Sequence, residues 1–128
     1  MLTAPVVSES NKTLTEEDFD EMMISLSTRI RATGRELTNV YAMETGGKAA
    51  ERLAELLDLP LVDEKMFIHK KTIVVDTVSE SGNTFRELKN EVGDFYSVAL
   101  VLNYNSNFIP HIYGMLRKNK WIKFHWED

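Results

Sequence analysis

The stretch from Ile73 to Thr84, which reads IVVDTVSESGNT, decides the fold. It begins with three β-branched apolar residues, reaches an acid at Asp76 and continues in small polar residues. Continuous apolar runs of this kind are typical of strands buried in a parallel sheet, and α/β sheets bind ligands at the carboxyl ends of their strands. We therefore expect a buried strand over Thr72–Asp76 that ends at a ligand site.

The small polar residues after Asp76 suit a phosphate group. We expect a loop over Thr77–Asn83 and then a helix over Thr84–Glu91, so that hydroxyls and backbone amides gather at a helix N-terminus. The residues that form this cradle are Ser79, Ser81, Gly82, Asn83 and Thr84. Asp76 could accept hydrogen bonds from sugar hydroxyls or hold a hydrated Mg²⁺. The alternative is an ordinary strand-to-helix turn with capping Ser and Thr residues.

Helical and strand patterns alternate along the rest of the chain. Thr15, followed by three acids, predicts the start of a helix that ends at Gly34. The other expected elements are strands over 39–43, 59–62 and 97–102, a helix over 48–57, and short strands near Trp121 and Phe124. This alternation predicts a single α/β domain with a parallel-sheet core flanked by helices.

Length and composition limit the number of domains and the classes of protein to which the chain can belong. A chain of 128 residues fits one domain, which we expect over residues 14–128 after a flexible N-terminal arm over 1–13. The absence of cysteine excludes disulfides and thiolate metal sites. No apolar run approaches the ~20 residues that span a bilayer, so we expect a cytoplasmic protein without a membrane partner. The net charge of −5 argues against nucleic acid as a partner.

Residues 73–85 resemble the phosphoribosyl-pyrophosphate (PRPP) signature of the type I phosphoribosyltransferases, which has four apolar residues, an acidic pair and a terminal Ser/Thr-Gly-x-Thr. Three further segments, 15–20, 40–57 and 120–127, are similar to the small xanthine-guanine members of that family. The resemblance implies their α/β fold with a small C-terminal hood. It also implies transfer of the phosphoribosyl group from PRPP to a nucleobase, chiefly a purine, with Mg²⁺ as cofactor and a homodimer as the assembly.

The resemblance also implies a role for each matching residue. Asp76 and Glu80 would be catalytic, Asp76 by holding the ribose hydroxyls and Mg²⁺ through water, Glu80 by taking or sharing the proton of the base. The PRPP loop would comprise Asp76, Thr77, Ser79, Glu80, Ser81, Gly82, Asn83 and Thr84, and the pyrophosphate loop Glu44, Thr45, Gly46 and Gly47. The Glu44–Thr45 peptide would be cis. Trp121 would stack on the base, and the Ile122 backbone would contact its edge.

The sequence departs from the family pattern at several functional positions. Thr77 replaces the second acid, Thr45 stands where a cation is usual, and no Lys or Arg between Lys89 and Arg117 can read the 6-oxo group of a purine. The connection over 63–71 is short for a mobile loop. Two alternatives therefore stay open, a module that binds nucleotide or PRPP without turnover, and a sheet protein whose loop matches by accident.

One substitution follows from the expected phosphate cradle. Gly82→Val is expected to fill the cradle and block phosphate binding while it leaves the fold largely intact.

Overall fold

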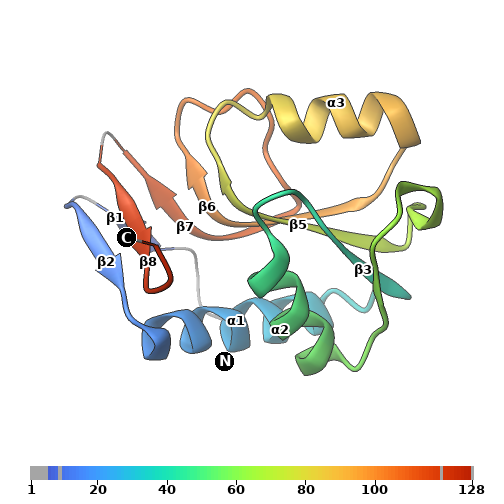
Figure 1. Cartoon of the computed structure of the whole chain (residues 1–128), viewed down its shortest axis with the longest axis horizontal. Helices are drawn as coiled ribbons and strands as arrows, with labels where there is room; N and C mark the ends of the chain where they lie inside the picture. Colours follow the sequence, from blue (N-terminus) through green and yellow to red (C-terminus); the bar gives the residue numbers. More distant parts are fainter. Residues whose placement is uncertain (1–5, 9, 119, 128) are drawn as a thin grey trace.

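A computed structural model describes residues 6–8, 10–118 and 120–127. In this part of the chain, six parallel strands form the main sheet in the order β1-β7-β6-β5-β3-β4 (Figure 1). Their bounds are β1 Val6–Ser8, β7 Ile112–Arg117, β6 Tyr96–Asn103, β5 Thr72–Ser79, β3 Asn39–Ala42 and β4 Leu61–Val62. The parallel-sheet α/β fold expected from the sequence is confirmed.

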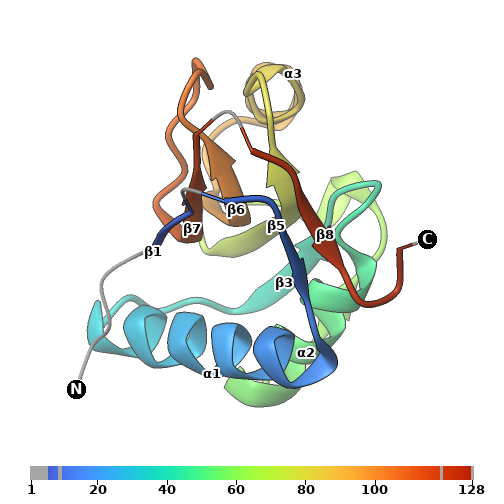
Figure 2. The ribbon, with the colours of Figure 1, turned by 90° about the vertical axis from the view of Figure 1, so that its left-hand side faces the viewer.

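Helices cover both faces of the sheet. Figure 2 shows α1 (Glu16–Ala32) and α2 (Gly47–Leu57) on one face and α3 (Asn83–Val92) on the other. The side chains of successive β5 residues point to opposite faces of the sheet. Ile73 and Val75 pack in the core beneath α1 and α2, whereas Val74 packs in the core beneath α3. The continuous apolar run in β5 is explained by this burial on both sides.

The start of α1 confirms the helix signal at Thr15. The Thr15 hydroxyl accepts from the Asp18 amide at 3.1 Å, and the Asp18 carboxylate accepts from the Thr15 amide at 2.9 Å. This reciprocal capping box satisfies two amides at the helix end. Leu14 and Phe19, on either side of the cap, are both buried in the core.

Strand β5 is longer than expected and continues through Asp76 to Ser79. The expected loop over Thr77–Asn83 is therefore wrong in its first half, and the loop starts at Glu80. The extension is stabilised by β6, which pairs with it as far as Ser79 and Leu102. Asp76 consequently lies within the strand, where it is paired with Ala99 of β6.

Segments near both ends of the chain form strands, and two of these strands start within the N-terminal arm expected over 1–13, whose flexibility stays a prediction. β1 pairs with β7 at the edge of the main sheet and so covers its unpaired backbone groups. β2 (Lys12–Leu14) pairs with β8 (Ile122–Phe124) in a separate parallel pair, the small hood of the fold. The rest of the arm, 1–5 and 9, lies outside the described residues.

The turn between β3 and α2 passes directly over β5. The Met43 amide donates to the Val75 carbonyl and the Gly46 amide to the Met43 carbonyl, both at 2.8 Å. The expected cis peptide at Glu44–Thr45 is wrong, since the peptide bonds of the described residues are all trans. Hydrogen bonds of ordinary trans peptides close the turn, so it needs no cis bond.

The close crossing at Gly46 generates a prediction about stability. A Cβ on Gly46 would lie 2.3 Å from the Val75 carbonyl oxygen, whereas a Cβ on Gly47 would meet nothing within 4 Å. We expect Gly46→Ala to lower the free energy of unfolding by about 1–3 kcal/mol, because the turn must move off β5. The matched control Gly47→Ala leaves it unchanged or raises it by up to about 1 kcal/mol. Urea denaturation of the two variants measures both, and equal stabilities would contradict the crossing.

Candidate functional site

A cavity of about 320 Å³ lies where β3 and β5 end. It brings together the two loops that the sequence singled out, one between β3 and α2 and one between β5 and α3. The lining residues are Met43, Glu44, Thr45, Asp76, Val78, Ser79, Glu80, Ser81, Gly82 and Thr84. A polar cavity at the carboxyl edge of a parallel sheet is the usual ligand site of α/β proteins.

Asp76 lies at the centre of this site and is buried, with 6% of its surface exposed. Its Oδ1 accepts hydrogen bonds from the Thr45 hydroxyl at 3.0 Å and from the Thr77 amide at 2.9 Å. Burial raises the pKa of Asp76 above its ordinary value, although these two hydrogen bonds oppose the shift. Both bonds use Oδ1, which leaves Oδ2 available to a ligand.

Thr77, at the position of the family's second acid, does not line the cavity. Its side chain is buried, and its hydroxyl donates to the Thr45 carbonyl. Thr45 is therefore held twice, through its side chain by Asp76 and through its backbone by Thr77. Thr77 thus fixes the loop between β3 and α2 to β5, a role that the sequence pattern did not indicate.

Two helices begin at this edge of the sheet without a capping side chain. Gly46 is the N-cap of α2 and Gly82 the N-cap of α3, and a glycine has no side chain with which to cap its helix. The amides of their first turns are donors that an anion can use, and the helix dipoles add positive potential there. Among the described residues, one side chain bonds to these amides: the Asn83 amide donates to the Ser81 hydroxyl at 3.2 Å.

Ser79 adds an unsatisfied hydroxyl to the site. The residue is 3% exposed, and its Oγ has no hydrogen-bond partner among the described residues. Unpaired buried polar groups are costly, so they are retained mainly where a ligand or water completes them. Ser79 therefore fits a site for a polyhydroxyl or phosphate ligand.

Gly82 is required by the fold as well as by the cradle. Its φ is +87°, and a Cβ there would lie 2.6 Å from the Phe108 nitrogen. The expectation that Gly82→Val leaves the fold largely intact is therefore wrong, because the new side chain would press on the backbone between β6 and β7. The segment between β6 and β7 also bonds to the loop between β5 and α3, since the Asn107 amide donates to the Ser81 carbonyl at 2.8 Å.

Glu80 is exposed, and its carboxylate pairs with Arg117 at 3.0 Å. Arg117 ends β7 and lies opposite Asn103 of β6, whose side-chain amide donates to the Glu80 carbonyl at 3.3 Å. No Lys or Arg lies close to Asn103 along the chain, so the sequence alone does not indicate a role for Arg117. The sheet register brings this cation to Asn103 from the adjacent strand.

The charge of the cavity wall is negative. Glu44, Asp76 and Glu80 line it, and none of its described lining residues is Lys or Arg. No group of three His, Cys, Asp or Glu side chains in the described ranges could hold a metal ion alone. Asp76 Oδ2 still fits the Mg²⁺ expected from the family, because that ion is commonly held by one or two carboxylates together with substrate phosphates and water.

Several expected site residues lie outside the cavity. Gly46, Gly47 and Asn83 belong to its two loops but do not line it. Trp121 is half exposed beside β8, where its carbonyl accepts from the Lys12 amide at 3.1 Å, and Ile122 is buried in β8. The hood does reach α2, since the Lys48 ammonium lies 5.9 Å from the centre of the Trp126 ring. Base binding by Trp121 and Ile122 stays a prediction.

These features define an α/β protein with a polar cavity at the carboxyl edge of its sheet. Solved structures with this fold include the purine phosphoribosyltransferase of Pyrococcus horikoshii Ot3, with a TM-score of 0.72 and 23% identity over 92% of this chain and 95% of the other. Another is the xanthine-guanine-hypoxanthine phosphoribosyltransferase of Helicobacter pylori, with a TM-score of 0.70 and 19% identity over 91% of this chain and 93% of the other. A Neisseria gonorrhoeae protein with bound ppGpp matches with a TM-score of 0.72 and 19% identity over 94% of this chain and 92% of the other.

The chain therefore has the phosphoribosyltransferase fold that the resemblance implied. No family model and no curated protein sequence matches it. None of the helices in the described part of the chain has the length and apolar character that a membrane crossing requires.

The raised pKa of Asp76 generates a prediction about stability and pH. Because burial penalises the ionised form, the folded state holds the Asp76 proton more tightly than the unfolded state does. We expect Asp76→Asn to raise the free energy of unfolding at pH 7, since an amide keeps the Oδ1 acceptor without the charge. The gain is absent well below pH 3.8 and grows as the pH rises from 3.8 through the folded-state pKa. Urea denaturation across this range measures it, and a variant less stable than the wild type at pH 7 would contradict burial of the charge as the cause.

Proposed function

We propose that the protein is a phosphoribosyltransferase that transfers the 5-phosphoribosyl group from PRPP to a nucleobase, chiefly a purine, and releases pyrophosphate. The observation that carries this proposal is a single polar cavity that is lined by Asp76, by the loop that leads into α2 and by the loop that leads into α3. A substrate with a phosphate at each end of a ribose matches that arrangement, because each helix end suits one anionic group.

The proposed binding roles follow from the two loops. The loop of Ser81–Thr84 and the first turn of α3 bind the 5′-phosphate through backbone amides. The turn of Glu44–Gly47 and the first turn of α2 bind the diphosphate, where Gly46 allows the backbone to lie close to β5. Asp76 Oδ2 accepts hydrogen bonds from the ribose hydroxyls, and the Ser79 hydroxyl finds a partner in the same ligand.

Mg²⁺ completes the proposal because the wall of the cavity carries acids and no described Lys or Arg. The ion would neutralise part of the diphosphate charge when bound, and Asp76 would hold it through water. Thr77 and Thr45 then serve to keep the Asp76 carboxylate in place. Transfer passes through a ribose cation, and the nearby carboxylates stabilise positive charge at that carbon.

The base end of the site is proposed around Glu80 and Arg117. The Glu80 carboxylate takes or shares the proton of the base, and Arg117 holds that carboxylate from β7 at 3.0 Å. Arg117 also supplies the cation that reads an exocyclic oxygen of the base, which the sequence lacks near Asn103. Stacking on Trp121, a homodimer and a cytoplasmic location remain further parts of the proposal.

A binding module without turnover is the second candidate. Two observations favour it, the use of Thr77 to anchor a loop instead of a second acid facing the cavity, and the lack of Lys and Arg among the described lining residues. The Neisseria gonorrhoeae structure with ppGpp has the same fold, so a nucleotide is a reasonable ligand for such a module.

Turnover separates the two candidates. Purified protein with Mg²⁺, PRPP and a pool of purine and pyrimidine bases is analysed by mass spectrometry. We expect one or more nucleoside 5′-monophosphates to form, and we expect Asp76→Asn to lower the rate at least about 100-fold. Since that variant is expected to be stable, its lost activity would report on the site. Intact PRPP after incubation with the wild type would contradict the enzyme and favour the binding module.

Substitution of Arg117 tests the base end separately. We expect Arg117→Gln to raise the KM for the base about tenfold, because a charged hydrogen bond to the base and the anchor of Glu80 are both lost. The KM for PRPP should change less than about twofold. Lys118→Gln is the matched control, since its ammonium lies over Tyr104, outside the cavity lining. An equal rise in both KM values would contradict a role at the base.

A further inference from the structure

A second cavity, of about 490 Å³, lies at the opposite edge of the main sheet. Its lining residues precede strands instead of following them, with Leu37 before β3, Lys71 before β5, Phe95 before β6 and His111 before β7. Because the strands are parallel, this cavity is at their amino ends, and it shares no lining residue with the first one. Its volume is in the range of small-molecule sites.

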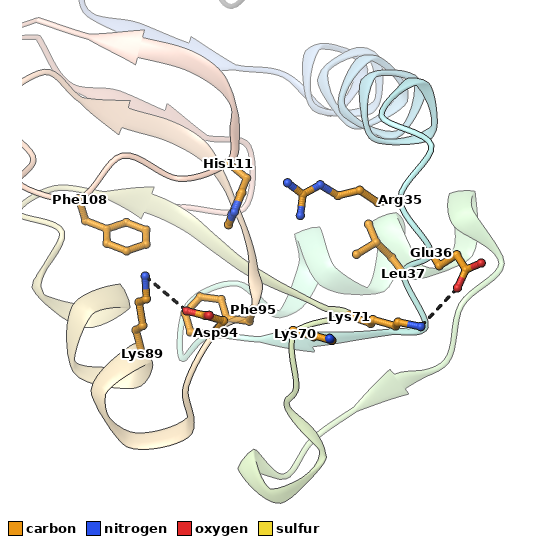
Figure 3. Close-up of a pocket in the computed structure, with 10 residues that line it drawn as sticks. All are labelled: Arg35, Glu36, Leu37, Lys70, Lys71, Lys89, Asp94, Phe95, Phe108 and His111. Carbon is orange, nitrogen blue, oxygen red and sulfur yellow. Dashed lines mark hydrogen bonds and ion pairs between the residues drawn. The ribbon is translucent and has the colours of Figure 1, made fainter.

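Cations outnumber acids around this cavity. The lining includes four cations and two acids, which are Arg35, Lys70, Lys71 and Lys89 against Glu36 and Asp94. The Lys71 side chain points toward Glu36, with which it pairs at 3.3 Å, and Lys89 pairs with Asp94 at 3.6 Å (Figure 3). Arg35 and Lys70 are left without an ion-pair partner among the described residues. Two uncompensated positive charges thus face one cavity on a chain of net charge −5.

His111 adds a hydrogen-bond donor to the lining of this cavity. Its Nδ1 accepts from the Ser97 amide at 3.0 Å, and the Ser97 hydroxyl lies 2.9 Å from the same nitrogen. In the neutral ring the proton is therefore assigned to Nε2. Partial burial and the neighbouring Arg35 and Lys89 lower the pKa of His111, which favours this neutral form. The Nε2–H has no acceptor in the described part of the chain and can donate to a ligand.

Aromatic rings hold these groups in place and form the apolar wall. The Tyr96 ring lies 4.7 Å from the His111 ring and 4.9 Å from the Arg35 guanidinium, measured to the ring centre. Figure 3 shows Arg35 extending toward His111, with Phe108 and Phe95 on the side of Lys89. Phe108 is fixed by stacking on Phe85, with ring centres 5.1 Å apart. Phe108 is partly exposed and Phe95 is 6% exposed, so an apolar group in the cavity would contact chiefly Phe108.

We propose that this cavity is a second ligand site, for a small anion that carries a planar apolar ring. The phosphate or carboxylate of the ligand binds Arg35, Lys70 and the Nε2–H of His111. Its ring lies against Phe108 and Phe95. The site is independent of the proposed transferase activity, because none of these residues lines the cavity of Asp76.

Nuclear magnetic resonance titration of the full chain tests this proposal at residue level. The probes are phenyl phosphate and benzoate in separate arms, with inorganic phosphate as the control that lacks a ring. We expect saturable shifts of the Ser97 amide and the His111 ring with at least one aromatic anion, and binding of inorganic phosphate about tenfold weaker or more. Tighter binding of phenyl phosphate would assign a phosphate, and tighter binding of benzoate a carboxylate, as the charged group of the ligand; either result supports the proposal.

Paired variants test the charges. We expect Arg35→Gln combined with Lys70→Gln to weaken binding of the aromatic anion about tenfold or more, because both cations contact the anion. The control, Lys118→Gln combined with Lys123→Gln, removes the same charge away from the cavity and should change affinity less than about twofold. The proposal is overturned by an absence of saturable shifts at Ser97 and His111, by equal binding of inorganic phosphate, or by unchanged affinity in the Arg35 and Lys70 variant.

Discussion

The crossing of the Met43–Gly47 turn over β5 is the contact on which the candidate site depends. Gly46 lies so close to the Val75 carbonyl that no side chain fits between them. One residue earlier, Thr45 is bound by Asp76 through its hydroxyl and by Thr77 through its carbonyl. These contacts set where α2 begins relative to β5 and therefore relative to α3. If the turn moved outward, the loops that lead into α2 and α3 would no longer line a common cavity.

Electrostatics at this crossing opposes stability and favours ligand binding. Asp76 is buried with a raised pKa, the Ser79 hydroxyl has no partner among the described residues, and the N-cap residues of α2 and α3 are glycines without a capping side chain. Each feature costs free energy in the free protein, and each could be relieved by one phosphorylated, hydroxyl-bearing ligand. By contrast, α1 carries a complete capping box, so the chain does form good caps away from the site. Such a local concentration of unsatisfied groups is typical of functional sites.

Local sequence signals predicted the elements whose causes are local. The cap at Thr15, the apolar run in β5 and the glycines before α2 and α3 were all readable, and with the family resemblance they gave the fold and both loops. Features that depend on tertiary pairing could not be read. The extension of β5 to Ser79 is stabilised by β6, the pairing of residues 6–8 and 12–14 involves strands a hundred residues away, and Arg117 reaches Glu80 only through the sheet register. The residues that line the second cavity come from five separate segments of the chain, so no sequence motif predicts this cavity.

The most direct test of the central claim is a titration of the protein with PRPP, with and without Mg²⁺, followed through backbone amide resonances. The account predicts saturable shifts of the Gly47 amide at the start of α2 and of the Thr84 and Phe85 amides at the start of α3. Both sets should move together with one affinity, and omission of Mg²⁺ should weaken binding at least about tenfold because the cavity wall is acidic. Binding that shifts only one helix start, or that is unaffected by Mg²⁺, would contradict a single diphosphate site between the two helices.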